Sequence, residues 1–353
     1  MGNKSSALPE DVVGMPSRVE ELEKLLALDS DTDVRVVGIC GMGGIGKTTL
    51  ANALYARISN QFAGCCFIDD VSKIYRGYGP IEVQKQLLCQ TLKEENLTIW
   101  NHSMGSNLIQ TRLCKIKSLV VLDNVDKVEQ LDKLAMTREC LGTGTRIIVI
   151  SRDGHILRGK ADGVYKVQPL DRDDALQLFC RKAFKSDYIM SGYGDLTYDV
   201  LRYADGHPLA IEVLGSFLYG RNVTEWRSAL ERLRENPMKD IMKVLRISYD
   251  GLKDTEKGIF LDIACFFDRE NKAYLKRVLH FRGFHPKIGL KVLIDKSLIT
   301  CKGMISMHDL LKELGKSIVK EESPKEPRKW NRLWDYKDVH NVISENMVKQ
   351  LLK

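Results

Sequence analysis

The stretch VRVVGICGMGGIGKTT, residues 34–49, combines three local patterns in an order that decides the fold. Residues 34–40 form a short run rich in β-branched side chains, which predicts a buried strand. Residues 41–48 follow at once and match the spacing GxxxxGK[ST]. Residues 47–58 then have a helical pattern. A strand, a glycine-rich loop and a helix in this order predict a loop whose backbone N–H groups surround an anion.

This loop predicts binding of a nucleotide through its phosphates. Lys47 is expected to reach the β- and γ-phosphates, and the hydroxyl of Thr48 is expected to coordinate Mg²⁺. The residues of the loop and of the first helical turn that are expected to contact the nucleotide are Gly41, Gly43, Gly44, Ile45, Gly46, Lys47, Thr48 and Thr49.

A second apolar run, residues 119–122, ends in Asp123. The ends of parallel strands meet at one edge of a sheet, where ligands bind in open α/β folds. Asp123 is therefore expected to act with Thr48 in holding the metal ion of the nucleotide.

Catalysis is a separate question from binding. Many ATPases of this type place a second carboxylate after the metal-binding Asp, where it orients or deprotonates water. Here that position is Asn124, which cannot accept a proton in the same way. Efficient hydrolysis is therefore not predicted. Asp126 is the nearest substitute, although its position favours a turn or cap.

Residues 145–150 form a third strand pattern that ends in Ser151, Arg152 and Asp153. Arg152 is open to two interpretations. It can sense a γ-phosphate through charge-assisted hydrogen bonds, or it can be a surface residue paired with Asp153.

Strand patterns also occur at residues 65–68 and 164–167, a helix pattern occurs at residues 18–28, and helix-compatible stretches separate the first four strands. Strands that alternate with helices imply parallel crossovers, so a doubly wound α/β domain is predicted for residues 12–170, after an N-terminal segment 1–11.

The second half of the chain is predicted to be mostly helical. A helical domain is expected over residues 171–236. Residues 237–322 include an apolar helix pattern at 259–267 and a hairpin pattern at 297–300 and 304–307, which together suggest a winged-helix domain. Residues 323–353 are expected to be a connector.

Composition limits the class of protein. Its 353 residues carry a net charge of 54 − 47 = +7, with acidic and basic residues interspersed, so charge alone does not imply nucleic-acid binding. Nine scattered cysteines without a CxxC pair favour a reducing compartment. No apolar run is long enough to span a membrane. A cytoplasmic, or nucleocytoplasmic, location is expected.

The first residues match a myristoylation pattern at Gly2, although a fragment that simply begins Met-Gly matches it equally well. Membrane association is expected only if Gly2 is acylated, and one myristoyl chain binds a bilayer marginally.

Together with later motifs, these residues resemble the NB-ARC module of plant TIR-type immune receptors, in the STAND class of P-loop ATPases. Residues 206–210, GHPLA, are similar to the family's GLPLA motif, and residues 307–309, MHD, to its MHD signature. Residues 260–267 resemble its buried fourth-motif helix. Asp126 and the RLW of residues 332–334 are typical of the TIR class.

The resemblance implies further nucleotide contacts. Val13 and Gly14 belong to the entry segment that packs against adenine, Pro208 contacts the base or ribose, and His308 approaches the β-phosphate of ADP. It also implies an ADP-bound closed form and an ATP-bound open form that oligomerises.

TIR and leucine-rich-repeat domains, which flank this module in the family, are not expected within these 353 residues. The hypothesis is therefore a nucleotide switch with at most weak ATPase activity. The alternatives are a constitutive AAA-like ATPase and a DNA-binding regulator that uses the helix at residues 286–296. That helix carries Leu290 and Leu293 as well as lysines, which indicates a core-facing helix, so a nucleic-acid partner is not expected.

Overall fold

The computed structural model describes residues 12–30, 32–134, 138–234, 241–296, 298–321 and 330–351. The chain divides into two compact units at the boundary between Pro169 and Leu170. Each unit has its own hydrophobic core.

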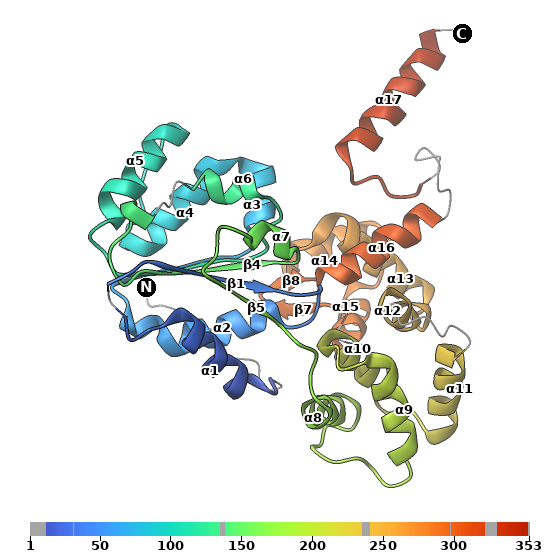
Figure 1. Cartoon of the computed structure of the whole chain (residues 1–353). Coiled ribbons are helices and arrows are strands. Elements are labelled where there is room, and N and C mark those ends of the chain that lie inside the picture. Colours follow the sequence, from blue (N-terminus) through green and yellow to red (C-terminus); the bar gives the residue numbers. More distant parts are fainter. Residues whose placement is uncertain are drawn as a thin grey trace. The chain divides into compact units, whose positions relative to one another are not determined.

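The first unit is built on a five-stranded sheet (Figure 1). Its strands are β1 (Arg35–Cys40), β2 (Gly64–Ile68), β3 (Ser118–Leu122), β4 (Arg146–Ser151) and β5 (Gly163–Lys166). They lie in the order β2-β3-β4-β1-β5, and every neighbouring pair is parallel. The parallel α/β sheet predicted from the sequence is therefore confirmed, and each predicted apolar run supplies a strand.

Helices cover both faces of this sheet, because successive residues of a buried strand point to opposite sides. Val37 of β1 and Val121 of β3 pack with α1 (Met15–Leu26) and α2 (Lys47–Ile58) on one face. Val120 and Val149 pack on the other face. The remaining helices of the unit are α3 (Val71–Tyr78), α4 (Pro80–Leu92), α5 (His102–Leu113), α6 (Val128–Asp132) and α7 (Gly154–Leu157), with 3-10 turns at Ser59–Gln61 and Arg138–Cys140.

The strand order determines which loops can share a site. β1 lies between β4 and β5, and β3 lies between β2 and β4. Because all five strands are parallel, the segments that follow β1, β2, β3 and β4 emerge at the same edge of the sheet. Four stretches distant in sequence are thereby brought to one edge.

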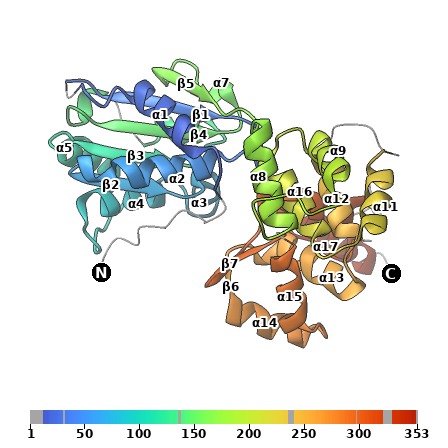
Figure 2. The same cartoon turned by 90° about the horizontal axis from the view of Figure 1, so that it is seen from below.

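The second unit begins with four helices, shown in green and yellow in Figure 2. They are α8 (Arg172–Ala183), α9 (Gly194–Ala204), α10 (Pro208–Leu218) and α11 (Val223–Arg234). Trp226 is buried against Phe179, Phe184 and Tyr193, and its indole N–H donates a hydrogen bond of 3.1 Å to the carbonyl of Leu218. An aromatic cluster thus fixes α11 against the preceding helices.

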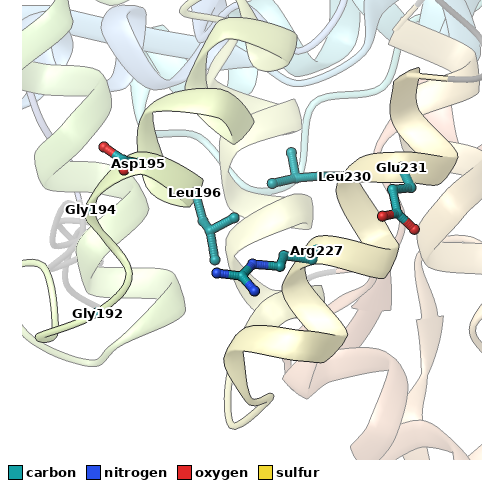
Figure 3. A pocket seen from close by; sticks show the side chains of 7 residues that line it. All are labelled: Gly192, Gly194, Asp195, Leu196, Arg227, Leu230 and Glu231. Atoms are coloured by element: carbon teal, nitrogen blue, oxygen red, sulfur yellow. The ribbon is translucent and has the colours of Figure 1, made fainter.

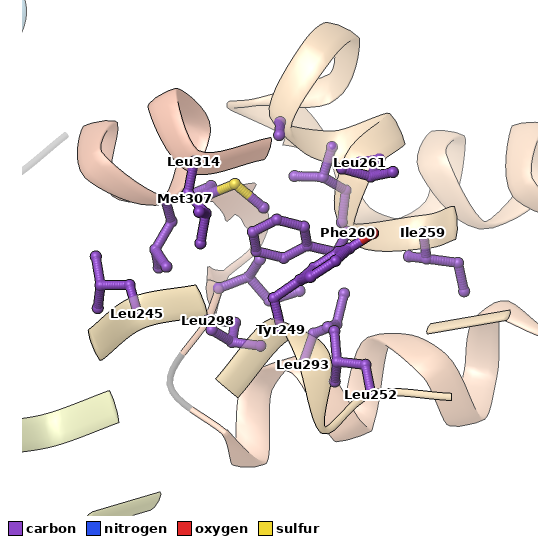
Figure 4. Close-up of a cluster of buried hydrophobic side chains, with 14 of the residues drawn as sticks. Leu245, Tyr249, Leu252, Ile259, Phe260, Leu261, Leu293, Leu298, Met307 and Leu314 are labelled. Atoms are coloured by element: carbon purple, nitrogen blue, oxygen red, sulfur yellow. The ribbon is translucent and has the colours of Figure 1, made fainter. Parts of the chain in front are cut away.

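A winged-helix arrangement follows in the same unit. Its helices are α12 (Ile241–Asp250), α13 (Asp254–Asp262), α14 (Lys272–Phe281), α15 (Pro286–Asp295) and α16 (Asp309–Glu321), and its strands are β6 (Glu270–Asn271), β7 (Thr300–Lys302) and β8 (Met304–Ser306). Phe260 and Leu293 lie in its buried core, part of which Figure 4 shows. Leu209 and Val213 of α10 belong to the same core.

Two sequence predictions for this unit need correction. The first hairpin strand was expected at residues 297–300 but lies at Thr300–Lys302, after the buried residues Leu298 and Ile299; residue 297 lies outside the described residues. A third strand, β6, pairs antiparallel with β8. The helix expected at residues 259–267 is α-helical only to Asp262 and continues as a π-helical turn, Ile263–Phe267. An extra residue per turn shifts the face that is presented to the core, so Phe266 is exposed.

The segment expected to be a connector is residues 323–353. Its described part contains a 16-residue helix, α17 (Tyr336–Leu351). The carboxylate of Asp335 accepts a hydrogen bond of 2.9 Å from the backbone N–H of Lys337, which satisfies one of the free donors at the helix start. In the sequence, Asp335 directly before residues 336–351 is the N-cap signal for this helix.

Candidate nucleotide site

The glycine-rich loop lies between the end of β1 and the start of α2, as the sequence predicts. Gly41, Gly44 and Gly46 all have positive φ, with values of 152°, 74° and 97°. At Gly46 an added Cβ would meet nothing within 4 Å, so the requirement for glycine there is conformational rather than spatial. Gly46 caps α2 without a side-chain acceptor, which leaves the first N–H groups of the helix directed at the loop.

Lys47 is buried, and its ammonium group lies over the loop. Its Nζ donates hydrogen bonds to the carbonyl oxygens of Gly41, at 2.8 Å, and Met42, at 2.6 Å. These contacts hold a positive charge above the anion-binding backbone, where a phosphate is expected.

Thr48 and Asp123 are brought together from α2 and the end of β3. The Thr48 hydroxyl donates a hydrogen bond of 2.9 Å to Oδ2 of Asp123. Burial raises the pKa of the Asp123 carboxyl to about 6, against the opposing effect of the Thr48 hydrogen bond. A buried carboxylate beside a hydroxyl provides the hard oxygen donors that Mg²⁺ prefers.

Asn124, the residue in the expected catalytic position, is committed to a structural contact. Its backbone is left-handed, with φ of 54°, and its Nδ2 donates a hydrogen bond of 2.8 Å to Oδ1 of Asp70. Asp70 is buried, follows β2 and caps α3, where its carboxylate also accepts from the backbone N–H of Lys73 at 3.2 Å.

Sequence reasoning missed Asp70. Residues 68–70 read Ile-Asp-Asp, so a pair of carboxylates follows a predicted strand, just as Asp123 does. That signal was available, but the adjacency of β2 and β3 was not, and only this adjacency places Asp70 beside Asn124.

Arg152 is exposed and follows β4, which lies between β1 and β3. The neighbouring carboxylate of Asp153 accepts a hydrogen bond of 2.8 Å from the backbone N–H of His155 and thereby caps α7. Asp126 exchanges hydrogen bonds with the side chain of Gln130, at 3.0 and 2.6 Å, so it is a turn residue at the start of α6.

The entry segment is tied to the end of the unit. Val13 is buried, and Gly14 has φ of 65° and precedes α1. Arg18 donates to the carbonyl oxygens of Gln168, at 3.0 Å, and Pro169, at 2.8 Å. These bonds fix the start of α1 against the chain that leaves β5.

Pro208 and His308 belong to the second unit. Pro208 is the first residue of α10, and the preceding His207 is a buried cap whose Nδ1 accepts from the N–H of Ala210 at 3.4 Å. His308 is exposed, and its Nδ1 accepts from the N–H of Leu310 at 3.1 Å at the start of α16. The side chain of Asp309 lies outside the described residues.

The second unit also contains a hollow of about 520 Å³, shown in Figure 3. It lies between the start of α9 and α11, and none of the predicted site residues lines it. Its lining residues are Gly192, Gly194, Asp195, Leu196, Arg227, Leu230 and Glu231.

The residues that the structure describes contain no cluster of three or more His, Cys, Asp or Glu side chains suited to hold a metal ion by themselves. A metal ion at Thr48 and Asp123 would therefore need ligands from a bound phosphate, which is how Mg²⁺ is usually held beside nucleotides.

A parallel sheet with this loop after its first strand defines a P-loop NTPase fold. Two family models match the chain: "NB-ARC domain" over residues 16–188, and "Disease resistance protein Roq1-like, winged-helix domain" over residues 253–323. The chain therefore contains an NB-ARC domain and a Roq1-like winged-helix domain, and the resemblance to the NB-ARC module of TIR-type receptors is confirmed.

Its relatives are plant disease resistance proteins. It is 40% identical to disease resistance protein RUN1 of Vitis rotundifolia, over 95% of this chain and 25% of that protein. It is 38% identical to TMV resistance protein N of Nicotiana glutinosa, over 96% of this chain and 30% of that protein. The chain thus spans about a quarter of the length of these relatives.

Among solved structures, a STAND protein with a tetratricopeptide repeat sensor from Pyrococcus horikoshii matches 92% of this chain and 45% of its own. The TM-score is 0.54 at 18% identity, which shows a shared fold. No helix in the described part of the chain combines the length and the apolar character needed to cross a bilayer.

Proposed function

We propose that this chain is the nucleotide-dependent switch of a plant immune receptor, which binds ADP or ATP with Mg²⁺ and hydrolyses ATP slowly. The observation that carries the proposal is the Thr48–Asp123 hydrogen bond of 2.9 Å directly beside a loop with three positive-φ glycines. The NB-ARC match and the disease resistance relatives support the biological setting.

The residues fit a Mg–nucleotide. The loop and the N–H groups of the first turn of α2 suit phosphate oxygens, and Lys47 supplies a cation above them. Thr48 and Asp123 would hold Mg²⁺, which when bound supplies charge neutralisation of the phosphates. Val13 and Gly14 would lie near the base.

Slow hydrolysis follows from the contacts of Asn124. An amide cannot take a proton from water, and this amide donates to Asp70, whose carboxylate also caps α3. The neighbouring Asp126 is engaged with Gln130. Arg152, exposed after β4, is our candidate for sensing the γ-phosphate.

The switch itself requires a nucleotide that binds two conformations with different affinities. We propose that Pro208 and His308 contribute to retention of ADP in a closed form, and that ATP favours an open form able to form homo-oligomers. The support for this step is the content and order of the GHPLA and MHD motifs. The flanking TIR and leucine-rich-repeat regions of such receptors would couple the switch to signalling and recognition.

The decisive experiment identifies the nucleotide in the purified chain by mass spectrometry and measures ADP and ATP binding by calorimetry. We expect co-purified ADP in the wild type and none in Lys47→Ala, with Lys115→Ala as a matched control at an exposed lysine of the same unit. A wild-type chain that binds neither nucleotide would overturn the proposal. Asp309→Val should lower ADP retention without abolishing binding.

A steady-state assay of phosphate release separates the switch from a constitutive AAA-like ATPase. Turnover at ordinary ATPase rates, about 1 per second or faster, would favour the ATPase. Release far below one phosphate per minute in a chain that binds ATP is the expected result.

A further inference from the structure

The winged-helix region contains an uninterrupted cationic stretch. Residues 272–294 contain no Asp or Glu, although the net charge of the chain is only +7. Within this stretch the Lys and Arg residues are Lys272, Lys276, Arg277, Arg282, Lys287 and Lys291. The stretch covers α14 and all of α15 except its last residue, Asp295.

These two helices have clearly separated faces. Leu275 and Leu279 of α14, together with Leu290 and Leu293 of α15, are buried in the core. The helix period places Tyr274, Arg277 and Phe281 of α14, and Lys287, Ile288 and Lys291 of α15, on outer faces, where all six are exposed. The core-facing character predicted for α15 is thereby confirmed, and its lysines lie on the opposite, exposed side.

Large apolar side chains also project from these outer faces. Phe281, in the last turn of α14, is 88% exposed, and Ile288, in the first turn of α15, is 67% exposed. Tyr274 is 45% exposed and lies two turns before Phe281 on the same face. Single exposed apolar residues are normal, but three large ones on two consecutive helices indicate an interaction surface.

Cations surround these apolar side chains. Arg277 lies one turn from both Tyr274 and Phe281, and Lys291 lies one turn from both Lys287 and Ile288. All three side chains are exposed, and within the described residues none of them forms an ion pair. Arg282 is different, because its guanidinium pairs with Asp262 at 2.6 Å. We call the set Tyr274, Arg277, Phe281, Lys287, Ile288 and Lys291 the α14–α15 corner.

Exposed apolar side chains together with exposed cations favour one kind of partner. Exposed cations without partners favour an anionic surface. A nucleic-acid duplex offers phosphates but no apolar layer for Ile288 and Phe281, whereas a bilayer offers anionic headgroups above hydrocarbon. We propose that the α14–α15 corner docks on an anionic phospholipid bilayer, with Phe281 and Ile288 inserted at the interface and the cations at headgroup depth.

The test is vesicle co-sedimentation with the full chain made in bacteria, where Gly2 is not acylated. Vesicles of phosphatidylcholine with 30 mol% phosphatidylserine are compared with pure phosphatidylcholine vesicles. We expect binding to the anionic vesicles only, with weaker binding at higher salt. Both Arg277→Glu/Lys287→Glu/Lys291→Glu and Phe281→Ser/Ile288→Ser should lower the affinity about tenfold or more.

Control variants distinguish specific vesicle binding by the α14–α15 corner from non-specific adsorption of exposed side chains. Tyr188→Ser, at an aromatic residue of the same unit that is 80% exposed, and Lys115→Glu should leave vesicle binding unchanged. Because the substituted side chains are exposed, unfolding transitions and nucleotide binding should match the wild type. The proposal is overturned if the wild type does not bind anionic vesicles, if the serine variant binds as well as the wild type, or if the corner binds duplex DNA in preference to vesicles.

Discussion

The hydroxyl of Thr48 donates a hydrogen bond to Asp123, which is 75 residues away in the sequence. Thr48 lies in the first turn of α2, after the glycine-rich loop, and Asp123 directly follows the buried strand β3. β3 and β1 are not neighbours, since β4 lies between them. The contact therefore reaches past β4 at the edge of the sheet where the strands end. It brings a hydroxyl and a carboxylate to the place where a Mg–nucleotide is expected.

The ionisation of Asp123 predicts how the effect of Mg²⁺ on ATP binding varies with pH. A metal ligand must be deprotonated, and burial raises the pKa of this carboxyl to about 6. We expect Mg²⁺ to strengthen ATP binding at pH 7.5 and to lose that effect as the pH falls below 6. Calorimetric titrations with and without Mg²⁺ at pH 5.5, 6.5 and 7.5 measure this. Equal Mg²⁺ effects at all three values would contradict it, and Asp123→Asn should show no Mg²⁺ effect at any pH.

The raised pKa of Asp123 also predicts how the stability of the chain without nucleotide depends on pH. Here the favourable effect is at low pH, whereas the effect on Mg²⁺ binding is favourable at high pH. The pKa of Asp123 is raised from its ordinary 3.8, so protonation favours the folded state. This favourable contribution is complete below pH 4 and is lost as the pH rises through about 6. At pH 7.5 without nucleotide, Asp123→Asn should therefore raise the free energy of unfolding by roughly 1 to 3 kcal/mol. Urea denaturation checks this, with Asp29→Asn, at an exposed position of the same unit, as the control expected to change little.

The Asn124–Asp70 hydrogen bond predicts how stability and ATP hydrolysis change when the amide and the carboxylate of these two residues are exchanged. In Asn124→Asp alone, two carboxylates would face each other at a spacing now bridged by a 2.8 Å hydrogen bond, so stability should fall. The double variant Asp70→Asn/Asn124→Asp restores one amide and one carboxylate, and it places the carboxylate directly after Asp123. We expect it to hydrolyse ATP at least tenfold faster than the wild type, since a general base contributes about 10²–10⁴-fold.

Steady-state phosphate release measures this effect. Asp70→Asn by itself keeps Asn124 and should show no gain. A double variant that folds, binds ATP and releases phosphate at the wild-type rate would count against the assignment of slow hydrolysis to position 124.

Asp262 predicts unequal effects of its two arginine partners. It is fully buried and pairs with Arg332 at 2.7 Å and with Arg282 at 2.6 Å. The side chain of Arg332 is 8% exposed and that of Arg282 is 41% exposed. Removing one partner of a buried pair costs about 3–5 kcal/mol, whereas a partly exposed pair contributes about 1 kcal/mol or less. Arg332→Ala should therefore destabilise the second unit more than Arg282→Ala does.

Tryptophan fluorescence during urea unfolding measures the difference in stability between Arg332→Ala and Arg282→Ala. The stacked rings of Trp330 and Trp334 pack against the same core and report on it. Similar losses in the two variants would refute the ranking, and Arg227→Ala, away from Asp262, is the matched arginine control.

Local patterns predicted much of the first unit. The five strands were recognisable because each is a short apolar run, and the phosphate loop because its glycines adopt backbone angles that other residues avoid. Predictions were weaker in the second unit. β6 has only two residues and is defined by its pairing with β8, and the π-helical turn after Asp262 has no spacing that separates it from an α-helix.

The sequence by itself determined the glycine-rich loop, the helix after it and the carboxylate at the end of β3, because each depends on neighbours along the chain. Only the tertiary structure decided which of these residues meet. The order β2-β3-β4-β1-β5 joins Thr48 to Asp123 and Asn124 to Asp70. Packing buries Asp123 and so raises its pKa, because the energy of a charge depends on everything that replaces water around it.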